Sequence, residues 1–167
     1  PRALSRMSSL AAAWLLLDGS GGRSPAWDAV EPVLQYSCRD RTLLGMQSDL
    51  LGAHALGLRN LMPITGNAPR PGEASWSTNV FDVDAIGLTN VVARLNHGLD
   101  VGDTPIGEPT RFYTIANATI GAPDLDAEVR RFEWKVDAGA ELGVTTPVFS
   151  REGLSRFLER VESVRIP

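Results

Sequence analysis

The sequence predicts an α/β fold of about four parallel strand–helix units, with one further helix in front of them. Three observations lead to this prediction. Short β-prone apolar segments alternate with longer segments that carry apolar residues at helical spacing. Capping residues and glycines stand where the helices would begin and end. Strands that alternate with helices of this length pair in parallel through right-handed crossovers.

The first part of the chain predicts a helix, a strand and a second helix. Residues Leu4 to Leu17 carry apolar side chains at helical spacing, and a glycine-rich run follows them. The first strand is predicted at Val33–Cys38, because this segment is β-prone and is bounded by a proline and by charged residues. The next helix is predicted from Arg41 to Leu56, with Gly57 closing it.

The second strand leads to the first candidate site. It is predicted at Leu61–Ile64 and breaks into the turn Thr65-Gly66-Asn67, followed by a Pro/Gly-rich loop to Gly72. In parallel α/β proteins the chemistry usually lies at the carboxyl ends of the strands, because the loops there can vary without disturbing the core. A helix from Ile86 to Leu95 is predicted after this loop.

The last part of the chain predicts two more units. A strand is predicted at Arg111–Ala116, and a helix then begins after Asp124, which can cap its first turn. The fourth strand is predicted at Leu142–Val148, and the helix after it begins at Ser150. Four such units make about half of a closed barrel, which typically needs roughly 250 residues. A doubly wound open sheet is the alternative, and periodicity alone does not separate the two.

Length and composition indicate one soluble domain over residues 1–167, with 43% hydrophobic and 22% charged residues. The formal net charge of −4 gives no basic face for nucleic acid or an acidic membrane. The longest apolar run, Leu10 to Leu17, is far too short to span a bilayer. Nothing demands an oxidising compartment, so we expect a cytoplasmic protein.

The sequence predicts no metal site and no disulfide. Cys38 is the only cysteine, which excludes an intramolecular disulfide and a multi-cysteine metal site, and a buried, inert thiol is the default for it. His54 and His97 have no second ligand at the spacing of a zinc site.

Both ends of the sequence lead us to expect a segment of a longer protein. The sequence begins inside a helical pattern, and Val164–Pro167 has the pattern of the first residues of a strand. A half barrel would expose two unpaired strand edges and an apolar inner face, so we also expect aggregation or homo-oligomers of the isolated chain, unless the remainder of the barrel is present.

A series of short motifs then occurs in one order along nearly the whole chain. They are Cys38-Arg39-Asp40-Arg41, Gln47-Ser48-Asp49-Leu50-Leu51-Gly52-Ala53-His54, Ile64-Thr65-Gly66-Asn67, Phe81-Asp82-Val83-Asp84, Ala122-Pro123-Asp124-Leu125, Lys135-Val136-Asp137-Ala138-Gly139-Ala140 and Thr145-Thr146-Pro147-Val148-Phe149. As an ordered set they resemble the methylenetetrahydrofolate reductase family of flavin-dependent (β/α)₈ barrels. The similarity is closest to the bacterial branch fused to homocysteine methyltransferase.

The resemblance implies a fold and an activity. The fold would be a partial (β/α)₈ TIM barrel, from the second helix through the sixth, with the seventh strand starting. The activity would be the reduction of 5,10-methylenetetrahydrofolate to 5-methyltetrahydrofolate in one-carbon metabolism and methionine biosynthesis, with FAD as cofactor and NAD(P)H as electron donor. The family's general-acid glutamate lies on a first strand that this chain lacks, so no catalytic residue is assigned.

The resemblance also implies site residues. The positions that correspond to cofactor contacts are Gln35, Thr65, Gly66, Asn67, Asp82 and Lys135, and Thr146 corresponds to a folate contact. Lys135 matches the family. The family usually has histidine where this chain has Gln35, aspartate where it has Asn67, and glutamine where it has Thr146; on the strand ending near Thr119-Ile120, the fused branch usually has Asn-Pro.

The chemistry of these residues supports either a functional or a structural role. Gly66 permits a close approach of backbone, and Asn67 keeps the size of an aspartate without its charge near the flavin. Thr146 lacks the two-ended amide of glutamine and also fits a strand for purely structural reasons, while Gln35 cannot titrate. Lys135 could extend to solvent or meet a phosphate.

Three functions therefore remain open. The first is a segment of a FAD-dependent folate reductase. The second is a catalytically silent barrel segment that acts as a structural or interaction element, which the changes at Gln35, Asn67 and Thr146 favour. The third is a different barrel enzyme that binds phosphate at the Gly66 loop, which rests on the architecture alone.

Overall fold

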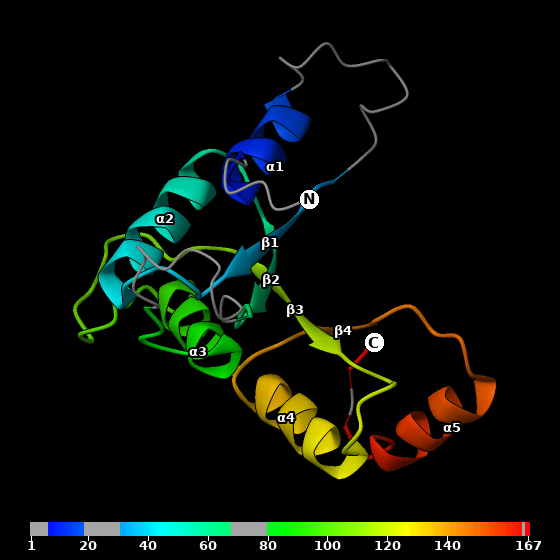
Figure 1. Cartoon of the computed structure of the whole chain (residues 1–167). Helices are drawn as coiled ribbons and strands as arrows, with labels where there is room; N and C mark the ends of the chain where they lie inside the picture. The colour runs from blue at the N-terminus through cyan, green and yellow to red at the C-terminus, as the bar shows by residue number, and fades with distance from the viewer. Residues whose placement is uncertain (1–6, 19–30, 68–79, 165) are drawn as a thin grey trace.

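The computed structural model describes residues 7–18, 31–67, 80–164 and 166–167, and it contains one parallel sheet with helices (Figure 1). The strands are β1 (Val33–Ser37), β2 (Asn60–Ile64), β3 (Tyr113–Ala118) and β4 (Leu142–Thr145). The helices are α1 (Ser9–Asp18), α2 (Leu43–Ala55), α3 (Ala85–Asn96), α4 (Leu125–Asp137) and α5 (Arg151–Arg160).

The four strands lie in the order β1-β2-β3-β4, and every neighbouring pair is parallel. Leu34 lies opposite Leu61, which lies opposite Thr114, and Ile115 lies opposite Leu142. Each strand is followed by a helix, as the crossover between parallel strands requires. The predicted α/β class and the predicted adjacency of the strands in sequence order are both confirmed.

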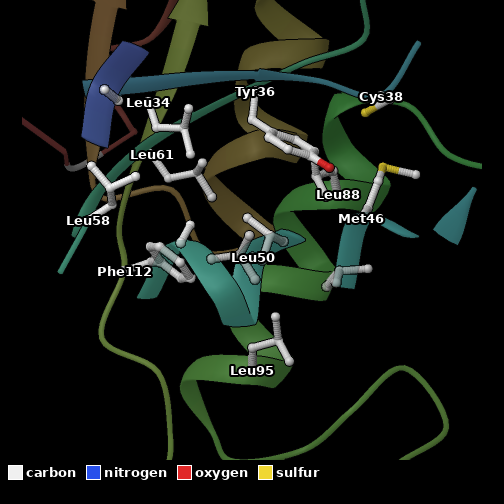
Figure 2. Packing of buried hydrophobic residues seen from close by; sticks show 14 residues of the cluster. Leu34, Tyr36, Cys38, Met46, Leu50, Leu58, Leu61, Leu88, Leu95 and Phe112 are labelled. Atoms are coloured by element: carbon white, nitrogen blue, oxygen red, sulfur yellow. The ribbon is translucent and has the colours of Figure 1, made fainter. Parts of the chain in front are cut away.

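The core lies between the sheet and the helices. Successive residues of a strand point to opposite faces, so Leu34 and Tyr36 are buried while Val33 and Gln35, which alternate with them, are exposed. Leu34 and Tyr36 pack with Met46 of α2 and other residues in a first cluster (Figure 2). A second cluster joins the end of β3 to α4 and α5, and in it the rings of Phe132 and Phe157 meet edge to face. The helix-facing side of the sheet is therefore the packed side.

Helices α2 to α5 begin with the same kind of cap, which α1 shares through Ser8. The side chains of Thr42, Asp84, Asp124 and Ser150 each accept a hydrogen bond from the backbone N–H three residues later. This bond satisfies one of the backbone donors that the first turn of a helix leaves free. The caps predicted at Asp124 and Ser150 are confirmed.

Most predicted boundaries lie within two residues of the structure, including the end of the third strand, which is Ala118 rather than Ala116, and three of the differences have an identified cause. The first helix begins at Ser9 rather than Leu4, because the Ser8 hydroxyl accepts from the Ala11 N–H at 3.1 Å and caps it there; residues 4–6 lie outside the described part. The third strand begins at Tyr113 rather than Arg111, because the Asn96 side chain holds the backbone N–H and C=O of Phe112.

The fourth strand is shorter than predicted. It ends at Thr145 rather than Val148. Thr146 still donates its N–H to the Ala118 carbonyl at 2.8 Å, but the following Pro147 has no N–H with which to continue the pairing. Beyond α5, the Pro167 carbonyl accepts from the Gly143 N–H at 2.8 Å, so the last described residues lie along β4.

Candidate functional site

A cleft of about 490 Å³ lies where the carboxyl ends of β2 and β3 meet the first turns of α3 and one face of α4. Five of the seven residues singled out from the sequence line this cleft together: Gln35, Thr65, Gly66, Asn67 and Lys135. They come from three separate parts of the chain, and the parallel sheet brings them to one edge.

The turn after β2 is fixed by its neighbours on both sides. Gly66 has a φ of +85°, and a Cβ there would lie 2.4 Å from the Ser37 Oγ. Arg39 donates from Nη1 to the Asn67 carbonyl at 2.8 Å, and the Thr65 Oγ1 accepts from the Ala85 N–H at 3.0 Å. Glycine is therefore required here by the contact with the end of β1, and the cofactor contact that the sequence suggested stays a prediction.

The loop after β1 is held from behind by a polar network. The Tyr36 hydroxyl donates to the Asp49 carboxylate at 2.6 Å, and burial, together with this carboxylate, raises the pKa of Tyr36. The Arg41 guanidinium lies 4.7 Å from the centre of the Tyr36 ring and donates to the Ser37 carbonyl at 2.9 Å. This network fixes the segment against which Gly66 packs.

Lys135 is a buried cation in the wall of the cleft. Its side chain is on α4, the residue is 7% exposed, and its Nζ donates to Asn117 twice, to the backbone carbonyl at 2.7 Å and to Oδ1 at 3.0 Å. Burial lowers the pKa of Lys135, and the nearby carboxylates of Glu128 and Asp84 partly oppose this effect. The extension to solvent that the sequence left open is not seen.

Glu128 lies on the same face of α4, two turns before Lys135. It is 4% exposed, and its Oε1 accepts from the Thr119 N–H at 2.8 Å. Its Oε2 lies 3.4 Å from an Arg131 Nη2. Buried carboxylates need such partners, because an unpaired buried charge is costly.

Sequence reasoning missed Asn117, Glu128 and Arg131, which also line the cleft. Two signals could have found part of this group. Glu128, Arg131 and Lys135 have the i, i+3, i+7 spacing of one helix face. Lys135 is also the only lysine of the chain, in which the other basic residues are arginines. Asn117 carries no such signal.

Two of the residues singled out do not line the cleft. The Asp82 Oδ2 accepts from the Leu43 N–H at 2.8 Å, so this carboxylate lies at the beginning of α2. Thr146 follows β4 and is bonded through its backbone to β3. Their contacts with a cofactor and a substrate stay predictions, and so do those of the five residues in the cleft.

The other candidate groups have structural surroundings. Cys38 is buried, and burial raises its pKa to about 11, so its thiol is protonated at neutral pH. His54 stacks edge-on against Phe112 with the ring centres 5.6 Å apart, whereas His97 is exposed at the end of α3. Within the described ranges, no group of three or more His, Cys, Asp and Glu residues could hold a metal ion. No helix in this part of the chain is long and apolar enough to cross a membrane.

Comparison with known proteins gives one family. A family model described as methylenetetrahydrofolate reductase matches residues 26–167, which include every motif that carried the resemblance. No match is found among curated proteins.

Proposed function

Because the chain belongs to the methylenetetrahydrofolate reductase family, we propose that its cleft is part of the flavin site of a folate reductase. The reaction is the reduction of 5,10-methylenetetrahydrofolate to 5-methyltetrahydrofolate, with FAD as cofactor and NAD(P)H as donor. The family match supports an oxidoreductase built on part of a (β/α)₈ barrel. The observation that carries the proposal is the buried ammonium of Lys135 in a cleft at the carboxyl edge of the sheet.

The residues of the cleft fit the chemistry of FAD. The cofactor carries a diphosphate, and the cleft is lined by two cationic side chains, Lys135 and Arg131, beside the carboxylates of Asp84 and Glu128. A partly buried cation attracts a phosphate more strongly than a solvated one, because the surroundings screen the charge less. The amides of Gln35 and Asn67 can donate to and accept from the polar atoms of a flavin ring system.

In this proposal, residues of the cleft bind the cofactor or orient it. Lys135 and Arg131 hold the diphosphate. Asn67 presents a neutral amide, so it orients the ring without adding the negative charge that an aspartate would bring. When bound, FAD supplies the hydride-transfer chemistry between NAD(P)H and the folate. Contacts of Asp82 with the cofactor and of Thr146 with the folate belong to the same proposal.

The second candidate is a barrel segment that has lost the reaction. Gln35 and Asn67 line the cleft but lack the groups that the family usually has there, and Thr146 lies outside it. These changes favour a chain that keeps the fold and acts as a structural or interaction element. Flavin binding separates the two candidates.

The test is a titration of FAD into the purified protein, followed by quenching of flavin fluorescence. We expect binding by the wild type, and a Kd raised by about tenfold or more in Lys135→Met, since a hydrogen bond to a charged group contributes about 1.5–3 kcal/mol. The matched control is Arg130→Met, which removes an exposed cation from the same helix outside the cleft. A wild-type protein that binds no FAD would overturn the proposal and favour the second candidate, the catalytically silent barrel segment.

A further inference from the structure

We propose that Asn117 is a positioning residue, which holds the ammonium of Lys135 in one place and leaves one of its N–H groups for the anionic part of the ligand. The inference rests on the proposed function, because it concerns the same cleft. It assigns a role to a residue that neither the motifs nor the family match singles out.

The geometry is that of a fixed cation. A lysine side chain is a flexible stem with three donors at its end. Two of these donors go to Asn117, one to the carbonyl at 2.7 Å and one to Oδ1 at 3.0 Å. Both acceptors belong to one residue of β3, and Lys135 is 7% exposed, so the ammonium has little freedom. One donor remains, and both residues line the cleft.

The charged groups around Lys135 do not replace Asn117 as hydrogen-bond acceptors for its ammonium. In the described part of the chain they are Glu128 and Arg131 on α4, and Asp84 at the beginning of α3. Burial lowers the pKa of Lys135, Arg131 lowers it further, and the two carboxylates raise it. Glu128 is engaged with the Thr119 N–H and Arg131. The oxygens bonded directly to Nζ are those of Asn117, and acceptors of this kind favour the charged form of the lysine.

Asn117 is also an unusual residue for its position. It lies opposite Val144 of β4, and asparagine is depleted in strands. Its side chain is half-buried, where a polar group is costly unless it is bonded. The bond to Lys135 accounts for the asparagine, and the backbone carbonyl beside it adds a second acceptor in the same direction.

The experiment uses Lys135 as its own probe. Because the chain has one lysine, labelling with ¹⁵N-lysine gives a single side-chain resonance, whose pH titration reports Lys135 alone. The variants are Asn117→Ala, Asn117→Asp and the control Asn60→Ala. Asn60 is a strand asparagine outside the cleft, whose side chain donates to the Glu31 carboxylate at 3.2 Å.

We expect the two Asn117 variants to shift the titration in opposite directions. Asn117→Ala removes one acceptor, so Lys135 loses its proton at a lower pH than in the wild type. Asn117→Asp adds a carboxylate, so Lys135 keeps its proton to a higher pH. In Asn117→Ala the Kd for FAD should rise by about three- to tenfold at neutral pH, and binding should be lost at a lower alkaline pH. Asn60→Ala should change neither property.

The outcomes separate this inference from the proposed function. A Lys135 titration that stays the same in both Asn117 variants overturns the positioning role, even if FAD binds. Shifts in the same direction in both variants also overturn it, because they indicate a general disturbance of the fold. Opposite shifts support the positioning of the ammonium. If the wild type then binds no FAD, the proposed function fails while the assignment of Asn117 to Lys135 stands.

Discussion

Gly66 is the residue whose identity the structure explains best. Its positive φ is costly for other residues, and a Cβ would lie 2.4 Å from Ser37 Oγ and 2.9 Å from Arg39 Cβ. Gly66→Ala should therefore lower the free energy of unfolding by about 1–3 kcal/mol, measured by urea denaturation. The control is Gly121→Ala, where a Cβ would meet no atom within 4 Å. Equal stability of the two variants would contradict the requirement for glycine at position 66.

His54 should make the stability depend on pH. Its Nε2 is buried with no hydrogen-bond partner in the described part of the chain, and burial lowers its pKa, with Arg59 and Arg111 adding to the effect. The folded state therefore keeps His54 neutral at pH values where the unfolded chain binds a proton, below about 6.5.

The sign of this effect follows from the proton count. The unfolded state binds more protons in that window. The contribution of neutral His54 to the free energy of unfolding is therefore complete above about pH 6.5 and is lost as the pH falls below it. Urea denaturation at pH 5.5 and 7.5 measures it. His54→Gln should weaken this pH dependence, whereas His97→Gln, at an exposed position, should retain it. An undiminished pH dependence in His54→Gln would contradict the assignment.

The sequence could locate the turn residues but not their partners. Thr65, Gly66, Asn67 and Lys135 lie in motifs that have the order and spacing of the family. Asn117 lies in no such motif, because its role depends on β3 facing α4 in the folded chain. Contacts between side chains that are distant in sequence are not encoded in local spacing, so the contact between Asn117 and Lys135 could not be predicted.

At the scale of elements, local chemistry predicted the helices well. The stripe Leu125, Val129, Phe132 and Val136 and the capping residue Asp124 predicted α4 within its observed bounds. The predicted start of β3 and the predicted end of β4 were wrong where a side chain or a proline interrupts the pairing. Asn96 holds Phe112 before β3, and Pro147 stops β4 early. The first effect depends on a contact between residues 16 positions apart in the sequence. The second agrees with the low β-propensity of proline, and the sequence could have predicted it.

The caps give a prediction at this scale. The Asp124 Oδ1 accepts from the Ala127 N–H at 2.9 Å, and the loss of such a cap typically costs about 1 kcal/mol. Asp124→Ala should lower the free energy of unfolding by about that amount, measured by thermal or urea denaturation. Asp124→Asn is the control, because asparagine caps helices as well as aspartate does. A loss of equal size in both variants would point to the charge rather than to the hydrogen bond.

At the scale of the whole molecule, the two faces of the sheet differ. One face is packed against the helices in both hydrophobic clusters. On the other face, strand residues of three strands are exposed: Val33 is 45% exposed, Tyr113 38% and Val144 39%. The family match identifies the fold as part of a barrel, in which this inner face would be filled by side chains of further strands. The α/β class was predictable from alternation, but the choice of a barrel needed the family motifs.

This exposed face predicts the behaviour of the isolated chain. Apolar residues that a barrel would cover should drive concentration-dependent self-association of the 167-residue protein, measured by size-exclusion chromatography with light scattering. Val144→Lys places a charge on this face and should reduce the association. The control Leu44→Lys places the same charge on an exposed residue of α2, at 68% exposure, and should leave the association unchanged. A monodisperse wild-type monomer over a wide range of concentrations would show that this face needs no partner.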